Sequence, residues 1–230
     1  MQNGYRHLFI DADDTLWENN VYFETAFARF AEILNHSCLS PAEVRKALDD
    51  IEHVNRVLYG YGSAQFGRNM QQCYRDLAER ACTPEDLDAV MDAALSIMRQ
   101  PLVLIEGVKE TLEYLKPRYQ LTLFTKGDPD EQHAKVKASG LEPYFDAVVV
   151  AREKDKRAYE GLLEQRQATR EESWMVGNSP KSDINPALAI GMNAAFVPHQ
   201  RNWHLEEEDL VPGVGKLLHL TRFDELQWHL

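Results

Sequence analysis

The chain has 230 residues, 44% of them apolar and 27% charged, which is the composition of a globular protein with one large domain or a domain plus a smaller one. Its 37 acidic residues outnumber the 25 lysines and arginines, so the formal net charge is −12, and neither nucleic acid nor an anionic membrane is expected as a partner. With no membrane-length apolar run, no signal peptide and three unpatterned cysteines expected to be reduced thiols, the sequence predicts a cytoplasmic protein.

The first predicted element is a short buried strand at residues 7–10, HLFI. No strand is predicted over the next hundred or so residues, whereas helix signals recur there. Apolar residues repeat at helical spacing in 21–34. Ser40 stands before Pro41 and Glu43, which predicts a capping box with proline at the first helical position, and Thr83 begins a similar pattern. The sequence therefore predicts an all-helical domain at residues 18–98.

Four further strands are predicted after this insertion, at residues 120–124, 147–150, 174–177 and 194–197. Helix-compatible segments such as DEQHAKVKASG separate them, and this alternation is typical of βαβ units with a parallel sheet covered on both faces. The predicted fold class is therefore α/β, a doubly wound parallel sheet formed by residues 1–17 and 99–230. The tail after residue 198 is expected to be a loop followed by a short helix or edge element.

Parallel α/β sheets bind ligands at the carboxyl ends of their strands, so the residues found there matter most. Four successive predicted strands end in the polar groups Asp11, Asp13 and Asp14; Thr125, Lys126 and Gly127; Lys154 and Lys156; and Asn178, Ser179, Lys181 and Asp183. Each set alone also fits an ordinary turn, a helix cap or a solvated charged run. Their joint placement at one edge of one sheet favours a functional site.

These residue types suit phosphoryl transfer through a covalent aspartyl intermediate. Asp11 at the strand end is the candidate nucleophile, and Asp13 is close enough in sequence to act as general acid and then as base. A divalent cation such as Mg²⁺ would offset the repulsion among so many carboxylates. Thr125, Lys126 and Lys154 are the candidate contacts to the phosphoryl oxygens.

The same segments resemble the four short motifs of the haloacid dehalogenase superfamily: FIDADDTL, LFTKGD, AREKDKRAY and MVGNSPKSDI. The resemblance implies a Rossmann-like core carrying a helical cap of the family's first class. It also implies that Asp11 is the nucleophile and Asp13 the acid/base, whose backbone carbonyl also meets the metal. Lys154, with Lys156 in reserve, fills the third motif, and the implied Mg²⁺ ligands are Asp11, Asp13, Asn178 and Asp183.

Two positions depart from the family pattern. Position 178 is Asn where the fourth motif normally has an Asp metal ligand, so the site is expected to bind its metal with less charge. Asp14 stands where the family often has Gly, and it either adds a carboxylate near the site or caps the following helix. Neither departure touches Asp11 or Asp13, so the reaction type expected from the resemblance is unchanged.

The expected function is that of a Mg²⁺-dependent phosphatase acting on a small phosphorylated metabolite. A dehalogenase or a phosphomutase on the same core, a receiver-type signalling module, and a catalytically weak binding protein are the alternatives. The loop 59–70 of the predicted cap is the candidate specificity segment, in which Tyr59, Tyr61 and Arg68 would contact the leaving group. Equally, its glycines fit a plain turn whose tyrosines pack.

Overall fold

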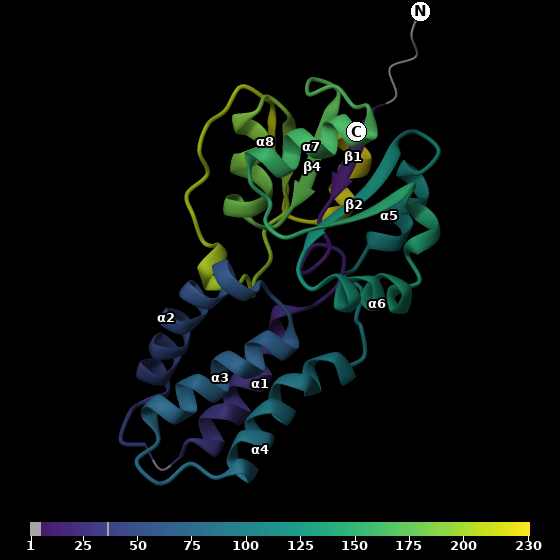
Figure 1. Ribbon diagram of the computed structural model, residues 1–230. Coiled ribbons are helices and arrows are strands. Elements are labelled where there is room, and N and C mark those ends of the chain that lie inside the picture. The colour runs from purple at the N-terminus through teal and green to yellow at the C-terminus, as the bar shows by residue number, and fades with distance from the viewer. Residues whose placement is uncertain (1–5, 36) are drawn as a thin grey trace, which may run out of the picture. The chain divides into compact units, whose positions relative to one another are not determined.

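The structure is a computed structural model that describes residues 6–35 and 37–230 (Figure 1). It contains a parallel sheet with strand order β3-β2-β1-β4-β5-β6. The strands are β1 (His7–Ile10), β2 (Gln120–Lys126), β3 (Ala147–Ala151), β4 (Ser173–Gly177), β5 (Asn193–Phe196) and β6 (Leu217–His219). The α/β fold class is confirmed, and the five predicted strands lie within two residues of the observed ones. β6 is the edge element of the C-terminal tail.

Helices cover both faces of this sheet because successive side chains of each buried strand point to opposite sides. Leu8 and Ile10 pack in one apolar cluster with residues of α5 (Val108–Leu115), α6 (Pro129–Ser139) and α9 (Leu226–His229). Phe9 packs in another cluster, with residues of α7 (Lys156–Arg166) and α8 (Asn185–Ala189). The shorter helical turns of this part are η2 (Glu142–Tyr144), η3 (Pro180–Ile184), η4 (His204–Glu206) and η5 (Phe223–Glu225).

The register of the central strands brings the polar strand ends level with one another. Ile10 of β1 pairs with Leu123 of β2 on one side and with Val176 of β4 on the other. The next backbone N–H, that of Asp11, donates to the carbonyl of Val176 at 2.9 Å. Asp11 therefore lies beside the ends of the two neighbouring strands, β2 and β4.

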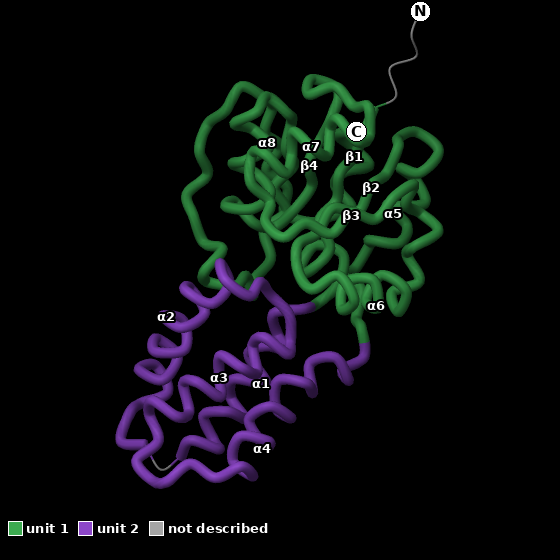
Figure 2. Tube along the Cα trace, viewed as in Figure 1, with its two compact units in different colours: residues 1–18, 102–230 green, residues 19–101 purple. Residues whose placement is uncertain are grey.

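The chain divides into two compact units, residues 1–18 with 102–230 and residues 19–101 (Figure 2); the limits predicted from sequence were 17/18 and 98/99. The second unit consists of α1 (Asn20–Ile33), α2 (Pro41–Tyr59), α3 (Ser63–Leu77), α4 (Pro84–Leu95) and η1 (Ser96–Arg99). It has an apolar core of its own, which includes Phe30, Leu48 and Met70. The capping boxes at Ser40 and Thr83 are both present.

Two simpler expectations concern membranes and thiols. Within the part of the chain that the structure describes, no helix combines the length and the apolar character that crossing a membrane requires. Cys38, Cys73 and Cys82 are all free thiols, and the first and last of these are exposed.

Candidate active site

A buried lysine joins two carboxylates at the carboxyl edge of the sheet. Lys154, in the turn between β3 and α7, donates hydrogen bonds to Asp11 and, at 2.7 Å, to Oδ1 of Asp183. The three residues are only 4%, 7% and 1% exposed, respectively. Burying an ammonium is tolerated here because it is paired and hydrogen-bonded. Lys156, the reserve candidate, is exposed at the start of α7.

One ammonium faces two carboxylates, and the titration of Asp11 reflects this imbalance. Burial and the charge of Asp183 raise the pKa of Asp11 to about 7, although Lys154 acts in the opposite direction. Burial alone would lower the pKa of Lys154, but the two carboxylates outweigh it and hold that pKa above its usual value. The edge of the sheet therefore carries more negative charge than its own lysine balances.

Asn178 and Thr15 complete the surroundings of Asp11. The Thr15 hydroxyl lies 3.1 Å from Asp11 Oδ2 and 3.1 Å from Asn178 Oδ1, and its single proton can serve only one acceptor at a time. The Asn178 amide donates to Oδ1 of Asn202 at 2.9 Å. Because Asn202 takes the amide N–H, the oxygen of Asn178 faces Thr15. Asn202 lies in the loop after β5, where no local motif marks it.

These groups fit a divalent hard cation. The donors are oxygens of two carboxylates and one amide, on Asp11, Asp183 and Asn178, and such cations prefer oxygen ligands. The unbalanced charge that raises the pKa of Asp11 is also the charge that a cation would offset. Gly177 leaves room for this set, because a Cβ at that position would overlap the Asp183 carboxylate.

Asp13 has a separate set of partners. Lys135 of α6 lies 2.8 Å from each carboxylate oxygen, and the Trp17 indole N–H donates to Oδ1 at 2.7 Å. Gln132, also on α6, donates to Oδ2 at 2.9 Å. Burial would raise the pKa of Asp13, but Lys135 and the hydrogen bonds outweigh it and lower that pKa. In this arrangement Asp13 is therefore an ionised carboxylate that can accept a proton.

Gln132 also connects the ends of β1 and β2. Its amide N–H groups contact Thr125 Oγ1 at 3.3 Å and the carbonyl of Lys126 at 2.7 Å, in addition to Asp13. A Cβ at Gly127, whose φ is +145°, would come within 2.7 Å of the Gln132 amide, so glycine is needed there. Gln132 was not predicted as a site residue, although it lies on the first turns of the helix that directly follows TKGD.

Lys126 lies in a different network from Thr125. Its ammonium contacts Glu206 Oε1 at 2.6 Å and the Ser182 hydroxyl at 2.9 Å. The other Glu206 oxygen accepts from Ser182 and, at 2.8 Å, from Ser179. Ser179 caps the N-terminus of the π-helical turn η3, and Ser182 lies within that turn beside Asp183. The contact of Lys126 with phosphate stays a prediction, whereas its observed partners hold the turn beneath Asp183.

Comparison with known proteins is consistent with this geometry. Residues 8–197 match the family model of haloacid dehalogenase-like hydrolases. The chain belongs to this family. It is 26% identical over 183 residues to a phosphoserine phosphatase of Thermus thermophilus, which covers 77% of this chain and 70% of that protein. It is 26% identical over 211 residues to the pyrimidine 5′-nucleotidase YjjG of Escherichia coli, covering 87% of this chain and 88% of that one.

A solved structure shares the whole architecture. A haloacid dehalogenase-like family hydrolase from Xanthomonas campestris superimposes with a TM-score of 0.85 and is 27% identical. The match covers 100% of this chain and 92% of that one. The protein is therefore a hydrolase of the haloacid dehalogenase-like family.

In this hydrolase Asp14 does not cap α1, because the residue before that helix is Asn19. Asp14 has a left-handed backbone, with φ 58°, and its carboxylate Oδ1 lies 3.8 Å from Nδ1 of His199. Nε2 of the same imidazole lies 3.4 Å from Glu18 Oε1. One ligand atom of each of these three residues lies within 4.8 Å of the others, a spacing that a metal ion fits. This group is distinct from the predicted metal ligands.

Proposed function

We propose that the protein is a Mg²⁺-dependent phosphatase that hydrolyses a small phosphorylated metabolite through a phospho-aspartyl intermediate on Asp11. The observation that carries the proposal is the buried contact of Lys154 with both Asp11 and Asp183. It gives a nucleophilic carboxylate and a fixed positive charge at one strand end. Relatives named as phosphatases and a nucleotidase support the same reaction class.

In the first half-reaction, a carboxylate oxygen of Asp11 bonds to phosphorus while the bond from phosphorus to the leaving oxygen breaks. Lys154 acts to lower the pKa of Asp11, which favours the ionised nucleophile, and it balances charge on the phosphoryl oxygens; Thr125 offers them a hydroxyl donor. A bound Mg²⁺ would be held by Asp11, Asn178, Asp183 and the carbonyl of Asp13, and would neutralise negative charge on the transferring group.

In the second half-reaction, a water oxygen bonds to phosphorus, the bond to Asp11 breaks, and Asp13 takes the water proton. The lowered pKa of Asp13 means that it is ionised and has a free site for this proton, while its contacts with Lys135 make it a weaker base. Donation of a proton to the leaving oxygen is a different matter. For that step Asp13 must first take up a proton, which requires Lys135 and Gln132 to release it.

The alternative activities account for fewer of these contacts. A dehalogenase also uses an aspartate nucleophile, but it lacks the second aspartate and needs no metal, so Asp13 and the Asp183 contact would have no purpose. A receiver-type signalling module does not explain the helical unit that follows β1. Asn178, which brings no charge to the metal site, is the one feature that favours a weak or non-catalytic protein.

The test is turnover of p-nitrophenyl phosphate and of a panel of phosphate monoesters with and without MgCl₂. Asp11→Asn is expected to lower turnover by about 10⁴-fold or more, since no nucleophile of equal strength remains. Asp50→Asn, which changes an exposed carboxylate on α2, is the control and should keep full activity. Lack of Mg²⁺-dependent turnover on the whole panel, or an active Asp11→Asn protein, would refute the proposal.

A further inference from the structure

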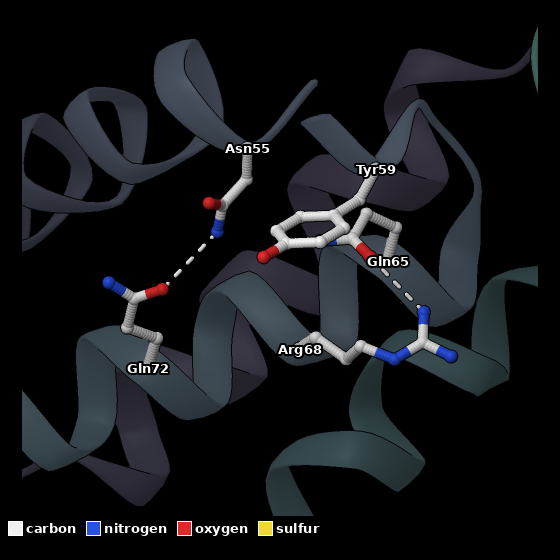
Figure 3. A pocket seen from close by; sticks show the side chains of 5 residues that line it. All are labelled: Asn55, Tyr59, Gln65, Arg68 and Gln72. Carbon is white, nitrogen blue, oxygen red and sulfur yellow. Dashed lines mark hydrogen bonds between the residues drawn. The ribbon is translucent and has the colours of Figure 1, made fainter. Parts of the chain in front are cut away.

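The helical unit contains a pocket of its own, lined by side chains that carry polar groups. It has a volume of about 440 Å³ and lies between the second half of α2 and the first turns of α3 (Figure 3). Its lining side chains are Asn55, Tyr59, Gln65, Arg68 and Gln72. All five belong to the unit of residues 19–101, so the pocket is complete within that unit.

A chain of oriented amides runs through this pocket from Arg68. A guanidinium only donates hydrogen bonds, so the Gln65 oxygen must turn toward it, and it accepts at 3.1 Å. The Gln65 N–H then donates to Asn69 Oδ1 at 2.9 Å, and the Asn55 amide donates to the same oxygen at 2.9 Å. Gln65 and Asn69 are buried, being 7% and 4% exposed, so this orientation is fixed by the interior of the unit.

The chain continues from Asn55 to Gln72, whose oxygen accepts at 3.2 Å (Figure 3). The oxygens of Gln65 and Gln72 each accept one hydrogen bond and that of Asn69 accepts two, whereas several N–H groups remain. One of the five N–H donors of Arg68 is used by Gln65, and among the described residues the Gln72 amide N–H groups donate no hydrogen bond. The pocket therefore presents the N–H donors of Arg68 and Gln72 together with one positive charge.

We propose that this pocket binds the carboxylate of a small organic molecule. Carboxylates accept without donating, and the planar fork of Arg68 matches their two oxygens. None of the five lining side chains is acidic, so no carboxylate of the protein lines the pocket. A phosphate dianion suits the site less well, since a single guanidinium offers it only half of the balancing charge. The volume exceeds that of a bare carboxylate, which leaves room for a carbon skeleton beside the Tyr59 ring.

The carboxylate has two possible sources with the same chemistry. It belongs either to the leaving group of the enzyme's own phosphorylated substrate or to a separate metabolite that binds the helical unit. The first source rests on the proposed phosphatase function, and the second does not.

Direct binding decides whether the pocket recognises carboxylates at all. Succinate, lactate and benzoate are titrated into the full-length protein and followed by NMR of the Arg68 Nε–H and by calorimetry. The corresponding amides, succinamide, lactamide and benzamide, serve as uncharged probes of the same shape. At least one acid is expected to bind at least tenfold more tightly than its amide, and Arg68→Gln should abolish this difference. Arg75→Gln, which changes an exposed arginine of α3 outside the pocket, should keep it.

Three results would overturn the proposal: no saturable binding of any acid, equal binding of acids and amides, or equal losses in the Arg68→Gln and Arg75→Gln proteins. Binding of inorganic phosphate that is tighter than that of the acids and is lost in Arg68→Gln would also overturn it. Kinetics then separate the two sources. If the bound acid competes with phosphate-ester turnover and Arg68→Gln raises KM only for esters that carry a carboxylate, the ligand is the leaving group. If binding persists without any kinetic effect, it is a separate metabolite. The binding result stands even if no phosphatase activity is found.

Discussion

The two units of the protein each bury a carboxylate, and they deal with it in opposite ways. At the edge of the sheet, Asp11 and Asp183 share the ammonium of Lys154. In the helical unit, Glu52 of α2 is 8% exposed, and among the described residues its Oε2 has no hydrogen-bond partner. Burial raises the pKa of Glu52 to about 8, because the nearby Arg45 does not outweigh it and Asp49 and Glu24 add to it.

The difference shows what a buried acid needs in order to remain charged. Without a cation in contact, Glu52 is protonated at neutral pH and adds a nearly apolar group to the packing. With Lys154 in contact, the pKa of the equally buried Asp11 is held to about 7, although burial and the charge of Asp183 raise it. The negative charge that Lys154 does not balance favours the binding of a divalent cation at this edge.

Replacing Lys154, whose ammonium Asp11 and Asp183 share, is expected to have the largest effect on stability. Lys154→Met is expected to lower the free energy of unfolding by about 3–5 kcal/mol, because two buried carboxylates lose their partner. Urea denaturation at neutral pH without metal measures it. Lys156→Met, at an exposed position of α7, is the control and should change little. Equal stability of the two variants would mean that Lys154 does not balance the site.

Glu52, the buried carboxylate of the helical unit, gives the second prediction. The unfolded pKa of Glu52 is near 4.5 and the folded one is about 8, so the protein loses stability as pH rises between these values. Glu52→Gln removes this loss and should be more stable than the natural protein by about 3 kcal/mol at pH 9, with no difference below pH 4. The two pKa values alone would give a larger stability difference. We expect a smaller one because the helices of the unit can separate and let water hydrate the ionised carboxylate.

Circular dichroism melts at a series of pH values measure this effect. Glu43→Gln is unsuitable as a control, since Glu43 belongs to the capping box of α2. Asp50→Asn, on the exposed side of the same helix, is suitable. A Glu52→Gln protein with the same pH profile as the natural one would show that Glu52 is ionised, and the contrast between the two units would fail.

A third prediction concerns the network behind Asp183. Glu206→Gln removes the carboxylate that contacts the partly buried Lys126 ammonium and loosens the serines around η3. We expect kcat for phosphate esters to fall about tenfold to thirtyfold with KM nearly unchanged, corresponding to about 1.4–2 kcal/mol in the transition state. Glu208→Gln, at an exposed neighbouring position, should be neutral. A rise in KM alone would instead place Lys126 in substrate binding.

The smallest expected effect comes from adding charge to the metal site. Asn178→Asp should tighten Mg²⁺ binding about tenfold, or about 1.4 kcal/mol, because a carboxylate replaces an amide oxygen. The same variant should melt at a lower temperature without metal, since it places another carboxylate close to Asp11. Melting temperatures across a MgCl₂ titration report both effects. A variant with unchanged response to Mg²⁺ would remove position 178 from the ligand set.

Local signals predicted the parts of the fold that local physics decides. The apolar runs became strands, and Ser40 and Thr83 became capping residues, because both depend on neighbours in sequence. The partners of the site could not be predicted in this way. Lys135 and Glu206 lie on a helix and a C-terminal turn without any motif, and only the tertiary fold brings them to Asp13 and Lys126.

The alternation of side chains along a strand separates Lys126 from Thr125. Lys126 follows Thr125 on β2, and successive side chains of a strand point to opposite faces. Thr125 faces Gln132, and Lys126 faces Ser182 and Glu206. Contact of both residues with one phosphate stays a prediction. The roles of the remaining site residues stay predictions until the variants above are measured.

Two residues that hold the site in place lie beyond the segment that matches the family model. The family match ends at residue 197, yet Asn202 orients the Asn178 amide and Glu206 anchors the turn that carries Asp183. A protein shortened after residue 198 would keep every motif segment and still lose both contacts. Chains that share the motifs but differ in this tail can therefore differ in metal affinity and rate, and a motif search alone will not separate them.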